Sequence, residues 1–325
     1  MKLLSICIPT YNRAFFLKDS LLAILNSIDS QNYSEIEIVI SDNCSTDDTQ
    51  SVIASFQVAK PELEWINVRQ EPNIGPSNVI LVTRYASGKF IWILSDDDVV
   101  LPHSINKIIY ELKTNPNING ILVNYAGFEK DVEKLDHSIL PLSEKVFDKD
   151  EALLYLGNSI NFISSVIFKK EAIKIENKFL DNSLPHAFVF LQALRHGNFK
   201  AIPRILLGMR IGNSGGYDFY TVFVETFSQV LDYALNLGFS ENIVNLTRKK
   251  QLRTQITVYS IIFKTQKKFE SLESNYLNAA KLILKHHKTD YYSYLVILIL
   301  YSPNFLIYPV NFLRKVRRKI LNKKI

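Results

Sequence analysis

Three adjacent aspartates, Asp96, Asp97 and Asp98, are the side chains in this sequence best suited to bind a metal ion. They directly follow the apolar run 90–94, which indicates a strand that is buried on both faces. Three neighbouring like charges repel one another, so a folded chain needs a reason to gather them. A hard divalent cation such as Mg²⁺ or Mn²⁺ supplies one, because it binds one or two carboxylates together with phosphate oxygens. The alternative that these residues leave open is an acidic loop that caps the next helix, where Pro102 suits the first turn.

Three further polar clusters lie where other predicted strands end. Strands are predicted at residues 3–8, 36–40, 65–68 and 90–94, and the polar clusters are Thr10–Arg13, Asp42–Asp48 and Asn73–Asn78. We expect Pro9 to end the first strand, because proline lacks the N–H that a sheet ladder needs. A helix is predicted after each cluster, and alternating apolar strands and helices predict an α/β fold with a mostly parallel sheet covered on both faces. Ligands of such sheets bind beyond the carboxyl ends of the strands, so all the clusters should meet at one edge.

Composition narrows the class of protein. With 325 residues, of which 47% are hydrophobic, the chain can bury a sizeable core. Its two cysteines, Cys7 and Cys44, form neither a disulfide framework nor a zinc site, which makes a reducing cytosol the simplest setting. The N-terminal apolar run is too short for a signal peptide. The sequence has no Gly-x-x-x-x-Gly-Lys-Ser/Thr loop and no Gly-x-Gly-x-x-Gly after the first strand, which argues against a phosphate-loop ATPase and a dinucleotide oxidoreductase.

The second half of the chain has a different pattern. After about residue 150 most segments show helical spacing, and Gly212–Gly216 is predicted to be a flexible hinge between two of them. We therefore expect a sheet domain that carries the catalytic site in residues 1–205, a helical extension in residues 206–289, and an aromatic, basic tail in residues 290–325.

The tail combines an uncharged segment with basic flanks. Residues 291–313 carry no charge, and a segment of this length could span a bilayer. Pro303 and Pro309 interrupt it, and basic residues lie on both sides of it, which fits spanning poorly. Tyrosines near its ends, and a net charge of +6 that is concentrated at the C-terminus, favour a segment that lies in the interface of a membrane with anionic lipid. Burial in the protein or in an oligomer, and a true span, are the alternatives.

The polar clusters, read in chain order, resemble a known set of motifs. Pro9–Arg13, Ser41–Asp47, Asn73–Gly75 and Ser95–Asp98 resemble those of the family 2 glycosyltransferases, over roughly residues 3–130 and loosely to about residue 200. The resemblance implies the GT-A fold, here a mostly parallel sheet flanked by helices with a helical C-terminal extension, and a nucleotide-diphosphate sugar as donor. The helical tail is similar to that of the bacterial surface-polysaccharide branch, in particular the abequosyltransferase-like enzymes of O-antigen assembly.

The resemblance implies a role for each matching residue. Pro9, Thr10, Tyr11 and Arg13 would line the nucleotide pocket, Asp42 would bind the base, and Asn73, Gly75 and Asn78 would border the nucleotide and its diphosphate. The family's usual Leu-Asp-x-Asp-Asp becomes Leu94-Ser95-Asp96-Asp97-Asp98 in this chain. Because Ser95 replaces the first aspartate, Asp97 is expected to bind the Mg²⁺ or Mn²⁺. Asp96 and Asp98 are supporting candidates, and Asp96 also counts among the donor-binding residues.

A catalytic base is expected before the helix predicted over residues 188–194. Many relatives carry an acidic pair about ten residues ahead of a Leu-Arg-x-Gly ending, here Leu194–Gly197, and His186 occupies that place. An imidazole can act as the base, because its pKa lies near working pH. Two alternatives remain: a structural histidine that simply follows Pro185, and Asp181 as the base.

These features together predict an inverting, metal-dependent glycosyltransferase that adds one sugar to a saccharide acceptor. One base and one metal site suffice for direct attack, without the two flanking carboxylates of a hydrolase. The acceptor is expected on a polyprenyl diphosphate lipid at the cytoplasmic, inner face of a bacterial cell membrane, and nucleic acid is not an expected partner. The sequence does not determine the donor base, the sugar, the linkage or the oligomeric state.

Two other functions stay open at this point. A nucleotidyltransferase that makes the donor usually needs a glycine-rich loop after the first strand, which Pro9–Arg13 lacks. The other alternative is a non-catalytic, membrane-associated carbohydrate-binding or scaffold protein.

Overall fold

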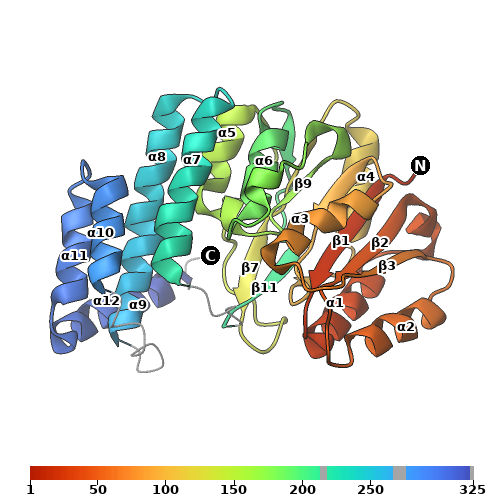
Figure 1. The fold of residues 1–325 in the computed structure, drawn as a ribbon, viewed down its shortest axis with the longest axis horizontal. Coiled ribbons are helices and arrows are strands. Elements are labelled where there is room, and N and C mark those ends of the chain that lie inside the picture. The colour runs from red at the N-terminus through yellow and green to blue at the C-terminus, as the bar shows by residue number, and fades with distance from the viewer. Residues whose placement is uncertain (213–217, 266–275, 323–325) are drawn as a thin grey trace. The chain divides into compact units, whose positions relative to one another are not determined.

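The computed structural model of the chain describes residues 1–212, 218–265 and 276–322, with side chains as far as residue 314. The chain divides into two compact units: residues 1–215 with 237–239 form the first, and residues 216–236 with 240–325 form the second. The first unit contains the sheets and the second is helical (Figure 1). Residues 213–216 of the predicted hinge lie outside the described residues.

A large sheet organises the first unit. In the part of the chain that the structure describes, eight strands form it in the order β3-β2-β1-β4-β9-β6-β10-β8. Their bounds are β1 (Leu4–Thr10), β2 (Ile36–Asp42), β3 (Glu64–Arg69), β4 (Phe90–Ile93), β6 (Gly120–Leu122), β8 (Val146–Phe147), β9 (Val166–Lys169) and β10 (Phe199–Ala201). β3, β2, β1 and β4 run parallel, whereas β9 is antiparallel to both of its neighbours and β8 is antiparallel to β10. The expected α/β sheet is therefore present, as a mixed sheet.

The parallel half of the sheet aligns the ends of the strands that the sequence predicted. Thr10 pairs with Asp42 in the register of β1 and β2, and Asp42 pairs with Arg69 in that of β2 and β3. Leu94, the residue after β4, donates its N–H to the Cys7 carbonyl at 2.9 Å. The loops that follow these strands therefore leave the sheet at the same edge.

The prediction that Pro9 ends the first strand is wrong, because β1 continues to Thr10. The Cys7 carbonyl faces β4, and backbone groups of every second residue in a strand face the same neighbour. The pairing with β4 stops at Cys7, so Pro9 faces that neighbour beyond the end of the ladder. Its missing N–H therefore removes no ladder hydrogen bond.

Six helices of the described part of the first unit accompany the sheet. They are α1 (Ala14–Asn26), α2 (Thr49–Ala59), α3 (Asn78–Leu81), α4 (Ser104–Thr114), α5 (Lys149–Leu156) and α6 (Pro185–Leu194). In α1, Leu17, Leu21 and Ile24 are buried at helical spacing, whereas Phe15 is exposed. The helix predicted after the cluster Asn73–Asn78 is the short α3, which lies between two 3₁₀ turns, Gly75–Ser77 and Val82–Tyr85.

A buried carboxylate fixes the turn that leads into β4. Glu37 in β2 is fully buried and accepts hydrogen bonds from the Ser5 hydroxyl, from the Ser87 N–H and hydroxyl, and from the Gly88 N–H. Burial raises the pKa of Glu37, but the hydrogen bonds from Ser5 and Ser87 outweigh it and the pKa lies below its usual value. Gly88 approaches Ser5 so closely that a Cβ would overlap it. The start of β4 is therefore held against β1 and β2.

A smaller sheet holds the segment that follows the three aspartates. Within the described residues it has three strands, β5 (Val99–Val100), β11 (Leu207–Arg210) and β7 (Tyr125–Phe128), with β11 in the middle. Leu207 and Gly208 pair with Val100 and Val99, and β11 runs parallel to β7. The acidic segment thus lies between β4 of the large sheet and β5 of the small one.

The second unit is helical, as predicted for the C-terminal extension. Its helices are α7 (Phe227–Asn236), α8 (Glu241–Gln251), α9 (Thr257–Thr265), α10 (Tyr276–His287), α11 (Tyr292–Tyr301) and α12 (Asn304–Asn322), with π-helical turns at Thr221–Thr226 and Leu252–Ile256. Its core includes Phe219, Tyr220, Phe263 and Val296. The rings of Phe219 and Phe263 meet edge to face with centroids 5.1 Å apart, so these aromatic residues serve packing.

The uncharged segment 291–313 is not one continuous helix. α11 ends at Tyr301, and α12 begins at Asn304, after Pro303. No helix of the described residues is both long and apolar enough to cross a bilayer.

Candidate functional site

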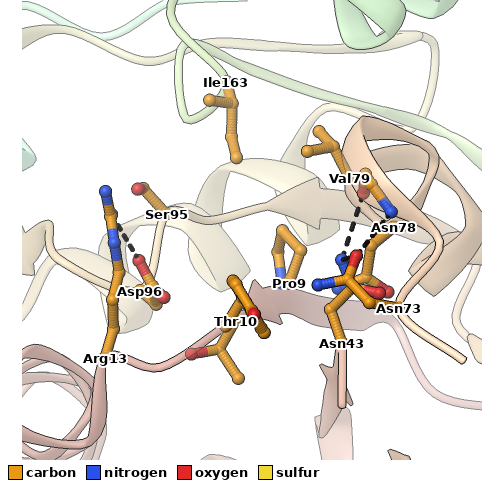
Figure 2. A pocket seen from close by; sticks show the side chains of 12 residues that line it. Pro9, Thr10, Arg13, Asn43, Asn73, Asn78, Val79, Ser95, Asp96 and Ile163 are labelled. Atoms are coloured by element: carbon orange, nitrogen blue, oxygen red, sulfur yellow. Dashed lines mark hydrogen bonds and ion pairs between the residues drawn. The ribbon is translucent and has the colours of Figure 1, made fainter. Parts of the chain in front are cut away.

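A pocket of about 430 Å³ opens at the carboxyl edge of the parallel strands. It is lined by Pro9, Thr10, Tyr11, Arg13, Asn43, Asn73, Gly75, Asn78, Val79, Ser95, Asp96 and Ile163. Figure 2 shows Arg13 and Asp96 on one side, Asn43, Asn73 and Asn78 on the other, and Thr10 between them. All the donor-binding residues expected from the sequence except Asp42 line this pocket.

Arg13 links two of the three aspartates. Its Nη1 atom lies 3.0 Å from Asp96 Oδ1 and 3.2 Å from Asp97 Oδ2. Asp96 is almost fully buried, and burial raises its pKa to about 6, although the charge of Arg13 opposes this change. Asp97 also accepts a hydrogen bond from the Ser95 hydroxyl at 2.6 Å. The two carboxylates therefore converge on one positively charged group at the edge of the pocket.

Asp98 is placed differently from its neighbours. It is buried, does not line the pocket, and accepts hydrogen bonds from the Ser164 hydroxyl at 2.7 Å and the Arg210 N–H at 3.3 Å. Burial raises the pKa of Asp98 well above its usual value, and the charge of Asp97 adds to this effect. Ser164 also accepts the Ser95 N–H at 3.0 Å. Asp98 thus ties the acidic segment to the protein interior, and the expectation that it binds metal stays a prediction.

The donor set fits a divalent cation that the substrate completes. No group of three or more His, Cys, Asp or Glu side chains within the described residues is arranged to hold a metal ion by itself. Asp96 and Asp97 nevertheless both lie within hydrogen-bond distance of Arg13 Nη1, so one oxygen of each carboxylate is already directed at the same point. Mg²⁺ binds through one or two carboxylates plus substrate phosphates and water, so two carboxylates are enough.

Arg210 fixes the acidic segment, and sequence reasoning missed it. Its Nε donates to the Asp97 carbonyl at 3.2 Å, and its Nη2 lies 3.1 Å from Asp19 Oδ2. Its guanidinium lies 5.1 Å from the ring centre of Phe16 and 4.9 Å from that of Phe128. Nothing in the local sequence distinguishes Arg210 from the other arginines that follow residue 205.

The opposite wall of the pocket is a network of amides. Asn43 Nδ2 donates to Asn73 Oδ1 at 2.9 Å and to the Gly75 carbonyl at 3.2 Å, and Asn43 Oδ1 accepts the Ile74 N–H at 2.8 Å. Gly75 has a φ of +61°, a conformation that favours glycine. Asn78 is fixed in turn, because the Ser41 hydroxyl donates to its Oδ1 at 2.6 Å. Asn43 was missed as a site residue, although it belongs to the polar cluster predicted after β2.

Asp42 is enclosed by the protein and does not line the pocket. Its Oδ1 accepts the Ser45 N–H at 2.9 Å, and its Oδ2 accepts from Gln50 Nε2 at 2.5 Å and lies 3.3 Å from Arg69 Nη1. In this state Asp42 organises the loop beside the pocket, and its contact with a base stays a prediction.

The two candidates for the base, His186 and Asp181, lie in different surroundings. His186 is buried at the start of α6, where its Nε2 lies 2.9 Å from the Asn161 carbonyl and its buried Nδ1 has no partner within the described residues. Burial lowers the pKa of His186 to about 4, against the effect of this hydrogen bond. Asp181 is exposed, and the carbonyl of its neighbour Leu180 accepts the Ser77 hydroxyl at 2.9 Å. Neither residue lines the pocket.

The chain was compared with known proteins. Residues 5–175 match the family model described as glycosyl transferase family 2. Abequosyltransferase RfbV of Salmonella typhimurium is 30% identical over 205 residues, which are 58% of this chain and 60% of that protein. The GalNAc(5)-diNAcBac-PP-undecaprenol beta-1,3-glucosyltransferase of Campylobacter jejuni is 30% identical over 186 residues, 55% of this chain and 54% of that protein. The matches thus span less than two thirds of the length of these relatives.

Solved structures resemble most of the chain. TarS of S. aureus, residues 1–349 in complex with UDP-GlcNAc, has a TM-score of 0.64 and 14% identity, over 93% of this chain and 89% of that one. A mannosyltransferase from Pyrobaculum calidifontis, in complex with GDP-Man and Mn²⁺, has a TM-score of 0.56 and 13% identity, over 91% and 85%. At these identities the likeness concerns the fold, and it confirms the GT-A type that the sequence predicted.

We predict that His186 makes stability depend on pH between about 6.5 and about 4. The buried ring stays neutral down to a pKa of about 4, whereas in the unfolded chain it is protonated below its ordinary pKa of 6.5. The unfolded state binds more protons in this window, so the free energy of unfolding decreases as the pH falls. On going from pH 7.5 to pH 5.0 in urea denaturation, the wild type should lose about 2 kcal/mol more than His186→Gln.

His287, another buried histidine whose pKa is lowered to about 4, is present in both proteins and cancels in this comparison. Equal losses in the wild type and in His186→Gln would show that His186 is not held neutral in the folded protein.

Proposed function

The chain belongs to glycosyl transferase family 2, as its motifs predicted, and from this premise we propose that it transfers one sugar from a nucleotide-diphosphate sugar to a saccharide acceptor. The observation that carries the proposal is the pocket in which Arg13 and Asp96 face a wall of asparagine amides, with Asp97 bound to the same Arg13 nitrogen from outside the pocket lining. At one end the Arg13 guanidinium, or a cation held by the carboxylates, offers positive charge to a diphosphate. At the other end the amides offer hydrogen-bonding groups to a nucleoside. The complexes of the structural neighbours with UDP-GlcNAc and with GDP-Man support a donor of this class.

The diphosphate that leaves during transfer is negatively charged, so the site needs positive charge beside it. Asp96 and Asp97 would hold Mg²⁺ or Mn²⁺ together with phosphate oxygens of the donor, and a cation bound there would neutralise the charge that builds up on the leaving group. Ser95 and Arg210 keep Asp97 in place through its carboxylate and its carbonyl, so the geometry exists before the donor binds. Transfer by direct attack on the far face of the sugar would invert the anomeric centre.

A base beside the pocket would activate the acceptor hydroxyl. Asp181 is exposed, and its neighbour Leu180 is hydrogen-bonded to Ser77, which lies in the chain between the pocket residues Gly75 and Asn78; both observations support Asp181 as the base. Burial and a pKa of about 4 argue that His186 supports the start of α6 and is not the proton acceptor in this state. Our proposal therefore places Asp181 ahead of His186.

The acceptor is proposed to be carried on a lipid diphosphate. The Campylobacter jejuni relative is named for such a substrate, as is an Escherichia coli relative, the UDP-Glc:alpha-D-GlcNAc-diphosphoundecaprenol beta-1,3-glucosyltransferase WfaP, which is 32% identical over 133 residues. An acceptor of this kind, and the name of the Salmonella relative, fit a step in O-antigen or other surface-polysaccharide synthesis at the cytoplasmic face of the membrane.

The helices α11 and α12 would hold the protein at that membrane surface. Large apolar side chains on them are exposed: Tyr291, Tyr294, Leu295, Leu298, Tyr301, Phe305, Leu306, Tyr308, Val310, Phe312 and Leu313. No charged residue interrupts residues 291–313, and Lys288 and Arg314 lie just outside this range. An apolar face with tyrosines and basic flanks is suited to the interface of a bilayer that contains anionic lipid.

We predict that Asp97→Ala strongly lowers the rate of transfer. The variant loses half of the carboxylate pair, so kcat/KM with the correct nucleotide sugar and Mn²⁺ should fall by about 10²–10³-fold. Release of the nucleoside diphosphate, measured across a panel of nucleotide sugars with a lipid-linked acceptor, reports the rate. Asp131→Asn, which alters a partly exposed aspartate that forms an ion pair with Lys134 and does not line the pocket, should leave the rate unchanged. A fully active Asp97→Ala would rule out this site.

We predict that Asp181→Asn lowers kcat by about 10²–10⁴-fold, because it removes the proton acceptor and leaves the pocket intact. Binding of the nucleoside diphosphate, measured by calorimetry, should not change. His186→Gln serves as the comparison and should reduce kcat by less than about tenfold. A large loss in His186→Gln together with an active Asp181→Asn would return the role to His186.

We predict that the double substitution Leu298→Ser and Phe305→Ser detaches the protein from membranes. Each side chain offers apolar area that a bilayer can cover, so binding to vesicles of phosphatidylethanolamine and phosphatidylglycerol should weaken by at least about tenfold. Flotation of the protein with the vesicles measures the binding. Leu246→Ser, a change of an exposed leucine on α8, is the control and should float like the wild type. Equal flotation of all three proteins would exclude this face.

A further inference from the structure

One nitrogen of Arg13, a residue of the pocket wall, occupies the point at which the carboxylates of Asp96 and Asp97 converge. Nη1 lies 3.0 Å from Asp96 Oδ1 and 3.2 Å from Asp97 Oδ2, and both aspartate side chains are largely buried, with 5% and 11% of their surface exposed. Two largely buried carboxylates that both contact one atom lie close together, and their mutual repulsion requires a positive partner. Arg13 supplies one such partner, and a single nitrogen of its guanidinium serves both carboxylates.

The backbone around Arg13 is fixed, which leaves the side chain as the part that can move. Asn12 has a φ of +51°, and it donates its N–H to Ser45 Oγ at 2.8 Å while its Oδ1 accepts the Thr46 N–H at 2.7 Å. On the other side, the Ala14 N–H donates to Asp47 Oδ2 at 3.0 Å. The side chain of Arg13 is 29% exposed and lines the pocket, so it can turn toward a bound ligand without any change in the loop.

We propose that Arg13 is an exchangeable counter-cation, which holds Asp96 and Asp97 together in the empty pocket and turns to the donor's diphosphate when a divalent cation takes its place. The proposal rests on the proposed function, because it concerns the same donor site. It assigns Arg13 two successive partners, the carboxylates and then the phosphates.

Charge balance favours this exchange. A divalent cation brings two positive charges to the two carboxylates, whereas the Arg13 guanidinium brings one. Once the cation is bound, a guanidinium about 3 Å from the same oxygens would meet a like charge at close range. The diphosphate offers the displaced guanidinium a new planar set of acceptors, which arginine binds well. The exchange therefore adds positive charge at the leaving group. Before the donor binds, Arg13 offsets the repulsion between the carboxylates of Asp96 and Asp97.

The proposal makes opposite predictions for two ligands. In Arg13→Gln the competitor for the carboxylates is gone, so Mn²⁺ should bind at least about tenfold more tightly in the absence of nucleotide. The same variant lacks the group that turns to the phosphates, so UDP and GDP at saturating Mn²⁺ should bind at least about tenfold more weakly. Electron paramagnetic resonance of free Mn²⁺ measures the first affinity, and calorimetry measures the second.

The control is Arg248→Gln, which breaks an arginine–carboxylate pair with Asp232 in the second unit and should change neither affinity. Circular dichroism and the melting temperature show whether Arg13→Gln folds. If it does not fold, Arg13→Lys takes its place, with the same two shifts expected at a smaller size.

A folded variant at Arg13 that binds Mn²⁺ as weakly as the wild type, or more weakly, would overturn the proposal, because Arg13 would then be a permanent partner of the aspartates. Nucleotide binding unchanged at saturating Mn²⁺ would overturn it as well. A wild type that binds neither Mn²⁺ nor a nucleoside diphosphate would instead contradict the proposed function, so the two failures are distinguishable.

Discussion

Two carboxylates that contact one arginine are the constraint on which the arrangement of the sheet unit around the pocket depends. Asp96 and Asp97 are largely buried beside each other, an arrangement that is unstable unless cations and hydrogen-bond donors surround it. Its supports come from distant parts of the chain: Arg13 after β1, Ser164 before β9 and Arg210 at the end of β11. The large mixed sheet positions β1 and β9, and the small sheet positions β11, so that these segments meet at one edge.

Much of this architecture was readable from local patterns, and the limits of that reading are physical. The apolar runs of β1, β2 and β4, and the polar residues at their ends, predicted where the pocket would lie. Arg210 was not predictable, since its contact with the acidic segment joins positions more than a hundred residues apart and leaves no periodic signal. β9 was missed altogether for a related reason, because its four residues are too few to show a period that separates a strand from a helix.

Burial was the other quantity that the residue types did not reveal. Asp98 and His186 carry groups suited to metal binding and to proton transfer, but both are enclosed, by Ser164 and by the Asn161 carbonyl respectively. Pro9 shows the same dependence on context, since β1 continues through it only because the ladder to β4 has already ended. Residues 291–313 of the second unit differ in kind, because they carry no charge and expose large apolar side chains such as Leu298 and Phe305, so composition alone pointed to an apolar surface there.

The central claim is that Asp96 and Asp97 gather a cation onto the diphosphate of a nucleotide. Pulsed electron–nuclear double resonance of Mn²⁺ bound to the protein together with a nucleoside diphosphate tests it most directly, because a phosphate oxygen on the metal transmits a coupling to its phosphorus nucleus. The account predicts a resolved ³¹P coupling in the wild-type complex. Mn²⁺ that binds the protein with the nucleotide present but shows no ³¹P coupling would contradict it.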